Sequence, residues 1–186
     1  MLSDLSASGM QLRLLEPADA ESLFALIDQN REHLRRWLGW VDTHLSVTNS
    51  LQFISQAQQQ FEQNNGFQMG IWYSGELAGV IGHLGVDWTN RSTELGYWLG
   101  ASFQGNGLAT MACRVLTEHA FHELELNRVE IRCAPENTRS RAIPERLGFR
   151  EEGTLRQDEW LNDHFEDTVV YGMLAADWPT ATPSVT

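Results

Sequence analysis

The chain has 186 residues, of which 42% are hydrophobic and 20% are charged, a composition typical of one globular domain with a substantial core. Its formal net charge of −12 argues against general nucleic-acid binding, because that function needs a basic surface. The two cysteines, Cys113 and Cys133, have no zinc-binding spacing and indicate no disulfide framework. No apolar run approaches the length of a membrane span and no signal peptide is visible after Met1, so a soluble cytoplasmic protein is expected.

The two ends of the chain differ from the part between them. Serine-rich residues 1–9 and proline-containing residues 179–186 are expected to be flexible, which leaves one domain over residues 10–178. Residues 10–15 predict a first strand. Pro17 then stands where the first turn of a helix tolerates proline, and a helix with an apolar face is expected after it.

Two further helical segments are predicted before the main sheet. Residues 30–40 form a short amphipathic piece that contains Trp37 and Trp40. Thr48 or Asn49 is expected to cap the next helix, in which apolar residues recur at helical spacing (Leu51, Ile54, Ala57 and Phe61).

The middle of the chain alternates between strands and turns. Residues 67–73 and 76–86 are strand-like runs joined by a serine–glycine pair, which predicts a hairpin. A third run, residues 93–100, leads through a glycine turn into a helix over residues 108–121, where apolar residues recur at i, i+3, i+4 and i+7. The pattern therefore predicts a sheet followed by a long amphipathic helix.

The remainder of the domain returns to the sheet. Residues 129–133 predict the next strand, and strand, helix and strand at this spacing make a βαβ unit, so its two strands are expected to be parallel. A short helix is expected over residues 140–147, ended by Gly148. Residues 149–160 and 165–174 then predict a final hairpin.

The glycine turn before the long helix predicts a binding site. Gly105, Asn106 and Gly107 all tolerate positive φ. Such a turn at a helix N-terminus gathers free backbone N–H groups at the positive end of the helix dipole. The stretch therefore predicts a site for an anion such as a diphosphate.

Two motifs around this turn resemble the GNAT superfamily of N-acetyltransferases. Gln104-x-x-Gly107-x-Ala109 matches that family's signature for the pyrophosphate of acyl-CoA. Asn137-x-x-Ser140, followed by a Gly-Phe pair at a predicted helix end, resembles the family's later motif beside the pantetheine. The signature alone is short, but the motifs occur in the family's order.

The resemblance extends over nearly the whole chain, from about Leu12 to Trp178, and points to one branch of the family. The Trp37-Leu-Gly-Trp40 region and the hairpin with Glu159-Trp160 resemble the branch that acetylates protein N-termini, including those of ribosomal proteins (the Rim type). Residues 34–47 and the Glu159 hairpin are accordingly expected to line the acceptor site.

The resemblance implies an α/β fold of the GNAT kind, with a central mixed sheet of α+β type and helices on both faces. In that family the sheet splays open between its fourth and fifth strands, here residues 93–100 and 129–133, and acetyl-CoA enters there. Gly100 is the expected site of the fourth-strand bulge. Pro144 departs from a regular helix, and is tolerable if that helix begins near Ser140, because the first four N–H groups have no helical partner.

The activity implied by the resemblance is acetyl transfer from acetyl-CoA to a primary amine, made directly in a ternary complex. The implied acceptor is the N-terminal α-amino group of a protein, best matched by a ribosomal protein. One alternative is a small-molecule amine such as an antibiotic, a polyamine or an amino-acid derivative, and another is a non-catalytic acyl-CoA-binding module. Coenzyme A is the expected product, no metal is expected, and a homodimer is consistent with the resemblance.

By resemblance, the acetyl-CoA site draws on the turn, the strand before it and the next motif. The turn and the first helical residues offer backbone N–H groups to the diphosphate (Gln104, Gly105, Asn106, Gly107, Leu108, Ala109 and Thr110). The backbone of Trp98 and Leu99 pairs with the pantetheine amides like an added strand. Asn137 and Ser140 contact the cofactor beyond the end of the following strand. Structural roles stay open, namely a plain strand–helix turn, a core position for Trp98 and helix capping by Asn137 and Ser140.

Acetyl transfer to an amine needs one group that accepts the ammonium proton and another that supplies a proton to the leaving thiolate. The resemblance assigns the first role to Glu159, acting through water, and the second to Ser140. Asp158 is expected to point to the opposite face of the strand from Glu159. His83, in the middle of a Gly-rich strand, and Glu94 are rival bases.

Overall fold

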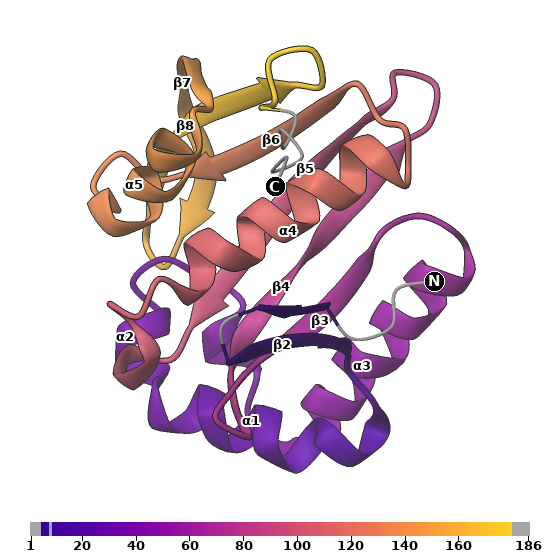
Figure 1. Ribbon diagram of the computed structural model, residues 1–186. Coiled ribbons are helices and arrows are strands. Elements are labelled where there is room, and N and C mark those ends of the chain that lie inside the picture. The colour runs from indigo at the N-terminus through magenta and orange to yellow at the C-terminus, as the bar shows by residue number, and fades with distance from the viewer. Residues whose placement is uncertain (1–4, 8, 180–186) are drawn as a thin grey trace.

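The structure is a computed structural model that describes residues 5–7 and 9–179 (Figure 1). Its strands, in chain order, are β1 (Leu5–Ala7), β2 (Met10–Leu14), β3 (Phe67–Tyr73), β4 (Glu76–Asp87), β5 (Ser92–Leu99), β6 (Arg128–Cys133), β7 (Arg150–Leu161) and β8 (His164–Leu174). Its helices are α1 (Ala20–Gln29), α2 (Arg31–Leu34), α3 (Val47–Glu62), α4 (Leu108–His122) and α5 (Thr138–Leu147), with single 3-10 turns η1 (Pro17–Asp19), η2 (Val41–Thr43) and η3 (Ala101–Phe103).

The described strands form one mixed sheet in the order β1-β2-β3-β4-β5-β6-β8-β7. Neighbouring strands are antiparallel except for β5 and β6, which are parallel as the βαβ spacing predicts. The β5–β6 pairing extends only from Ser92 opposite Arg128 to Leu95 opposite Ile131. Beyond these residues the two strands separate, which confirms the expected splay.

Helices cover both faces of the sheet. In Figure 1, α4 crosses in front of the sheet, and α1 and α3 lie below it. On the α4 face, Leu108 and Leu116 are buried against strand residues such as Leu95. On the other face, Ile54 of α3 is buried in a second cluster that includes Val80 of β4. Each fully buried aliphatic side chain of this size contributes about 1.5–3 kcal/mol to folding, so these two clusters hold the helices to the sheet.

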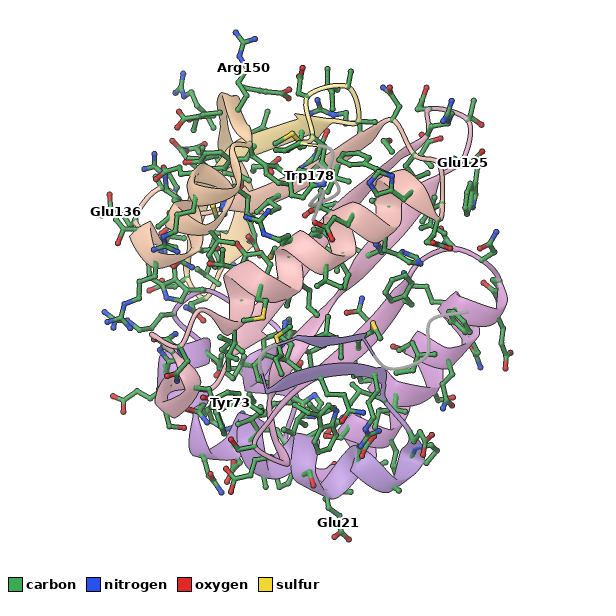
Figure 2. All side chains as sticks on the ribbon, in the orientation of Figure 1. Glu21, Tyr73, Glu125, Glu136, Arg150 and Trp178 are labelled. Atoms are coloured by element: carbon green, nitrogen blue, oxygen red, sulfur yellow. The ribbon has the colours of Figure 1, made fainter. Side chains whose placement is uncertain are left out.

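The residues after β8 pack onto the α4 side of the domain. Trp178 is 4% exposed, and its ring centroid lies 6.1 Å from that of Phe121 and 6.4 Å from that of Phe149. Figure 2 shows Trp178 over the body of the molecule, whereas Glu21 and Arg150 project from its surface. This core therefore includes residues from the end of the described chain.

One expectation in the N-terminal half differs from the structure. The N-cap of α3 is Ser46, not Thr48 or Asn49. The Ser46 side chain accepts a hydrogen bond from the Asn49 N–H at 3.4 Å, while the Asn49 side chain accepts one from the Leu45 N–H at 3.1 Å. Asn49 thus supports the cap from within the first turn. Of the two ends that are expected to be flexible, residues 1–4, 8 and 180–186 lie outside the described residues, while β1 pairs with β2.

Gly100 is not a bulge within β5. The strand ends at Leu99, and the Gly100 N–H donates to the Ala78 carbonyl at 2.9 Å. The irregularity in the β4–β5 pairing lies between His83 and Val86 of β4. A close approach explains the glycine instead, because a Cβ at position 100 would stand 2.9 Å from Cδ1 of Leu26.

The helix that contains Pro144 begins at Thr138, two residues earlier than expected, so the proline lies inside α5 rather than in its first turn. A proline at this position removes the N–H that would bond to the Ser140 carbonyl. The Tyr97 hydroxyl donates to that carbonyl at 3.2 Å and replaces the missing bond. The tolerance of Pro144 therefore comes from a contact with β5.

Candidate active site

The turn before α4 is open at the helix N-terminus. Gly105 and Gly107 have φ values of +82° and +74°, and a Cβ on either would have no neighbour within 4 Å. Gly107 is the N-cap of α4 and provides no side-chain cap. The first N–H groups of a helix have no partner within it, and here they belong to Leu108, Ala109 and Thr110. The free donors and the open space beside them fit a diphosphate.

Gln104 joins this turn to two helices that flank it. Its Nε2 lies 2.9 Å from Nε2 of His33 on α2, and its Oε1 accepts a hydrogen bond from Arg139 on α5. Because an amide N–H can only donate, Nε2 of His33 is the acceptor and the ring is neutral. Burial, together with Arg139 and Arg36, lowers the pKa of His33 and favours this neutral form. Gln104 is thus held between α2 and α5.

The last four residues of β5 have no strand partner on the side of the splay. Residues 96–99 pair with β4 on one side, whereas the pairing with β6 stops at Leu95. A ligand with amide groups could add to this edge as an extra strand. The Trp98 side chain points to the other face, where it packs on the α1–α3 cluster and its ring centroid lies 6.0 Å from that of Trp40. The backbone of Trp98 therefore faces the splay, whereas its side chain lies on the α1–α3 face of the sheet.

Asn137 and Ser140 stand just beyond the end of β6. Asn137 is the N-cap of α5 and accepts the Ser140 N–H at 3.2 Å, so it does have a capping role. The Ser140 hydroxyl is not the cap, and lies 3.2 Å from the hydroxyl of Tyr97. Burial raises the pKa of the neighbouring Cys133 thiol to about 11, and a hydrogen bond with Ser140 partly opposes this shift. The Ser140 hydroxyl therefore lies where β5 and β6 part.

Carboxylates gather near β5 on the acceptor side. Burial raises the pKa of Glu94, Arg132 at 3.5 Å opposes the shift, and Asp158 and Glu159 add to it. Glu159 is exposed, but partial desolvation of its carboxyl raises its pKa, with contributions from Asp158 and Glu166. A carboxylate with a raised pKa is a stronger base than an ordinary one, so both glutamates are suited to accept a proton.

β7 is irregular next to Glu159. Its register against β8 shifts between Leu155 and Glu159, and Gln157 has a φ of +53°. Strand alternation is lost at such a bulge. The expectation that Asp158 and Glu159 face opposite sides of a regular strand therefore does not apply here, and both carboxylates influence Glu94.

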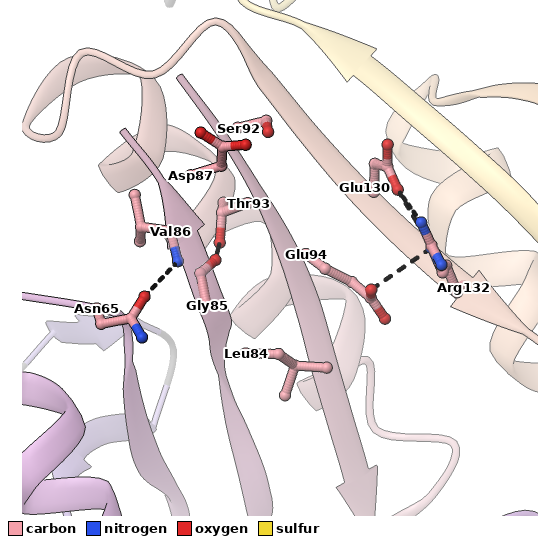
Figure 3. A pocket seen from close by; sticks show the side chains of 10 residues that line it. All are labelled: Asn65, Leu84, Gly85, Val86, Asp87, Ser92, Thr93, Glu94, Glu130 and Arg132. Carbon is pink, nitrogen blue, oxygen red and sulfur yellow. Dashed lines mark hydrogen bonds and ion pairs between the residues drawn. The ribbon is translucent and has the colours of Figure 1, made fainter. Parts of the chain in front are cut away.

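A shallow pocket of about 510 Å³ lies beside Glu94, on the face of β4, β5 and β6 (Figure 3). Leu84 lines it from β4, and Arg132 reaches from β6 to both Glu94 at 3.5 Å and Glu130 at 3.0 Å. Glu94 is thus partly neutralised by an arginine. Within the part of the chain that the structure describes, the Glu159 side chain makes no ion pair. This difference favours Glu159 over Glu94 as a general base.

The two segments expected to line the acceptor site contact each other. The Asn162 side chain, between β7 and β8, donates to the Arg35 carbonyl at 3.1 Å. A Cβ on Gly39 would stand 3.8 Å from the carbonyl oxygen of Trp160. Trp160 and Phe165 are both exposed, with ring centroids 4.9 Å apart. The α2–η2 segment and the β7–β8 turn therefore form one wall beside Glu159.

His83, the remaining candidate base, lies in the core. It is 0% exposed, its Nδ1 lies 3.2 Å from the Thr93 hydroxyl, and its ring is surrounded by those of Phe67 and His119. Burial, with a smaller contribution from His119, lowers its pKa to about 3. An acceptor amine has no access to such a ring, so the geometry does not favour His83 as the base.

The described residues offer no metal site and no membrane-spanning helix. They contain no group of three or more His, Cys, Asp or Glu side chains that could hold a metal ion. Cys113 and Cys133 are both free and buried. No helix over residues 9–179 is long and apolar enough to cross a membrane.

Residues 10–150 match the family model described as an acetyltransferase (GNAT) domain. The chain belongs to this GNAT family. It is 44% identical, over 90% of its length, to the "Putative ribosomal N-acetyltransferase YdaF" of Bacillus subtilis (strain 168), and covers 92% of that protein. It is 29% identical, over 90% of its length, to the "Ribosomal-protein-serine acetyltransferase" of Escherichia coli (strain K12), and covers 94% of it.

One similar GNAT structure was solved with acetyl-CoA bound. The microcin C7 self-immunity acetyltransferase MccE, in complex with acetyl-CoA and AMP, is similar with a TM-score of 0.86 and 30% identity. The similarity covers 90% of this chain and 93% of that chain. The expected GNAT fold and its Rim-type resemblance are confirmed, and the protein is an acetyl-CoA-dependent N-acetyltransferase.

Three side chains at the site of this GNAT enzyme are not among the residues that the sequence motifs indicated. They are Tyr97 beside Ser140, and His33 and Arg139 beside Gln104. His33 lies 71 residues from Gln104 in the sequence, so no local pattern could pair them. A signal for Arg139 was present, because α5 carries several arginines in a chain with a net charge of −12.

Proposed function

We propose that this GNAT enzyme acetylates the N-terminal α-amino group of a protein, most readily a ribosomal protein, by direct transfer within a ternary complex. One observation carries the proposal. Residues 96–99 of β5 have no strand partner toward β6, α4 begins shortly after that strand, and the Glu159 carboxylate helps to raise the pKa of Glu94 on the same strand. A donor bound along this edge leaves its thioester open to an amine from the acceptor side.

The state of the thiols supports direct transfer. An acetyl-enzyme intermediate on cysteine would need an accessible thiolate. Cys113 is 0% exposed, and burial raises its pKa far above its ordinary value. Cys133 is 9% exposed, with a pKa of about 11. Neither thiol suits that role at neutral pH.

In the proposed reaction, Glu159 accepts a proton from the acceptor ammonium through a water molecule. The neutral amine then attacks the carbonyl carbon, the C–N bond forms and the C–S bond breaks. The Ser140 hydroxyl supplies a proton to the leaving thiolate and regains one from solvent, while the new amide nitrogen loses its remaining extra proton to solvent. The raised pKa of Glu159 makes it a better proton acceptor than an ordinary glutamate.

The acetyl-CoA molecule would be held mainly by backbone groups. The N–H groups of residues 104–110 would bind the diphosphate, and the backbone of Trp98 and Leu99 would pair with the pantetheine. Asn137 would contact the cofactor beside Ser140. Arg139 and Arg146 on α5 bond to Gln104 and Thr110, and they place positive charge beside the turn.

The choice of acceptor rests on the relatives and on charge. The ribosomal names of the two curated relatives support a protein acceptor. The net charge of −12 favours a basic or amine-bearing partner. The pocket beside Glu94 favours a second candidate, a small cationic amine such as a polyamine, which would fit its volume and its carboxylates.

Labelled acetyl-CoA tests the acceptor directly. The enzyme would be incubated with [14C]acetyl-CoA and either ribosomal proteins with free N-termini or a panel of polyamines and aminoglycosides, and the labelled atom located by mass spectrometry. Label on a ribosomal-protein α-amino group is expected. Label on lysine side chains alone, or on small amines alone, would contradict the proposal. The printed sequence contains no lysine, so side-chain self-acetylation does not confuse the assay.

A further inference from the structure

The Tyr97 hydroxyl makes two contacts with one residue of α5. It lies 3.2 Å from the backbone carbonyl oxygen of Ser140 and 3.2 Å from the Ser140 hydroxyl. Tyr97 reaches α5 from β5, because its side chain points toward the α4 face and packs against the core there. Its hydroxyl therefore links the two walls of the splay at the residue proposed to protonate the leaving thiolate.

The carbonyl contact exists because of Pro144. Without an N–H at position 144, the Ser140 carbonyl has no partner within the helix, and the Tyr97 phenol occupies that place. A phenol carries one hydrogen, so it can donate to the carbonyl or to the hydroxyl, but not fully to both. The two acceptors are equally distant, which lets the hydrogen move between them by a small rotation.

We propose that Tyr97 is a positioning residue that holds the Ser140 hydroxyl toward the splay and donates a hydrogen bond to its oxygen during proton transfer. When the Ser140 O–H bond breaks and an S–H bond forms, the serine oxygen gains negative charge. The Tyr97 hydrogen then shifts from the carbonyl to that oxygen and stabilises the charge. No proton leaves Tyr97 in this step, and the serine recovers its proton from solvent.

The Tyr97 phenol stays protonated at neutral pH. Burial, with Cys113 as a smaller contributor, raises the pKa of Tyr97 well above its ordinary value, while the hydrogen bond with Ser140 opposes the shift. Tyr97 is therefore a permanent donor at neutral pH. A hydrogen bond to a charged oxygen is worth more than one to a neutral oxygen, so the contact is strongest when the serine carries charge.

The inference rests on the proposed role of Ser140, and a double-mutant cycle separates the two. Tyr97→Phe is expected to lower kcat about tenfold while the KM for acetyl-CoA stays unchanged, because only the charged state is affected. In a Ser140→Ala background, Tyr97→Phe should have no further effect on kcat. If Ser140→Ala leaves kcat unchanged, the proposed acid is wrong. If Ser140→Ala lowers kcat and Tyr97→Phe does not, only the role of Tyr97 is wrong.

Tyr171→Phe is the matched control. Tyr171 on β8 is also bonded to α5, through Arg141 and Glu145, and loses the same single hydroxyl. Its removal should leave kcat unchanged. An equal fall in kcat for both tyrosine variants would show that α5 merely needs anchoring, and would overturn the proposal.

Pro144→Ala shows whether Tyr97 acts on the Ser140 hydroxyl or only provides a hydrogen bond for the Ser140 carbonyl. The alanine restores an N–H for the Ser140 carbonyl, so a purely structural loss in Tyr97→Phe should be rescued in the Tyr97→Phe/Pro144→Ala double variant. We expect kcat of this double variant to stay low, since the Ser140 oxygen still lacks its donor. Recovery of kcat would refute the proposal. Thermal unfolding of each variant shows whether the protein remains folded, and the proline variant provides the test even if Tyr97→Phe alone is unstable.

Discussion

The two sides of β5 differ in what they offer a ligand. The donor side, formed by residues 104–110 with the start of α5, presents mostly backbone N–H groups whose direction is set by Gly105 and Gly107. The acceptor side, formed by residues 34–47 and the β7–β8 hairpin, presents side chains, among them Glu159. One side is defined by chain conformation and the other by residue chemistry.

This difference explains how one fold can keep its donor and change its acceptor. A backbone site needs only glycines at two positions and a helix that starts after them. A side-chain site changes whenever a residue on either wall changes. Acetyl-CoA binding should therefore survive most substitutions on the acceptor side, and turnover should depend above all on the carboxylate of Glu159.

The largest effect is expected for Glu159→Gln. Removing the general base should lower kcat about 100-fold or more, while the Kd for acetyl-CoA, measured by calorimetry, should not change. In the wild type, activity should fall as the pH drops through the raised pKa of Glu159, because the base must be unprotonated. That acidic limb should disappear in the variant.

Asp158→Asn is the control for this prediction, because it changes the adjacent carboxylate in the same irregular part of β7. It should have a much smaller effect on kcat than Glu159→Gln. A reversed order of the two effects would transfer the role of base to Asp158, and a loss of acetyl-CoA binding in Glu159→Gln would break the separation of the two sides.

His83→Leu should affect stability rather than chemistry. The folded-state pKa of about 3 lies below the unfolded value of about 6.5, so the neutral ring contributes stability that is complete above pH 6.5 and lost as the pH falls toward 3. Between pH 7 and pH 4 the wild type should lose about 3 kcal/mol of unfolding free energy through this residue, and the variant should not. Urea denaturation at both pH values measures the difference.

The catalytic rate gives the second readout for His83. At pH 7 the His83→Leu variant should retain kcat, because the ring is 0% exposed and packed against Phe67. A variant that stays folded but loses turnover would place the base in the core and contradict the acceptor-side assignment. His119, whose pKa burial also lowers, lies with its ring centroid 6.0 Å from that of His83, so a His119→Leu variant measured alone and together with His83→Leu gives its share.

The donor side could be predicted from the sequence because its determinants are local. The glycine turn, the helical period after it and the following strand all lie within one βαβ unit, so composition and spacing describe them completely. Non-local packing could not be predicted. Gly100 was expected to be a bulge, but the side chain that requires a glycine there is Leu26, which only the fold brings close.

The acceptor side was predicted only in outline. The sequence named Glu159 and the two segments that form the wall beside it. It could not show the contact between Asn162 and Arg35, which joins residues 127 apart in the chain. The clustering of Glu94 with the β7 carboxylates likewise depends on a bulge and a left-handed Gln157, which alternation rules do not foresee. The sequence marks Tyr97 only as a strand residue, because its contact with the Ser140 carbonyl depends on how α5 packs beside β5.

A smaller effect is expected for Gly107→Ala on the donor side. A residue with a Cβ at φ +74° costs about 1–2 kcal/mol of backbone strain, and the methyl group would enter the open space where the diphosphate is expected. The Kd for acetyl-CoA should rise about tenfold. Gly75→Ala, at φ +86° and equally unobstructed, should lose similar stability without a change in Kd. Equal Kd changes in both variants would mean that the turn has no special role.

The smallest effect is expected for Asn162→Gly. Its left-handed backbone at φ +56° suits glycine, so the substitution removes the hydrogen bond to the Arg35 carbonyl with little strain. A hydrogen bond of this kind contributes about 0.5–1.5 kcal/mol, so the KM for the acceptor should rise about threefold to tenfold while the Kd for acetyl-CoA stays constant. Asn64→Gly makes the same change at φ +54° in the loop after α3 and should leave both constants unchanged. A rise in the acetyl-CoA Kd with Asn162→Gly would show that the acceptor wall also shapes the donor side, and that β5 does not insulate one from the other.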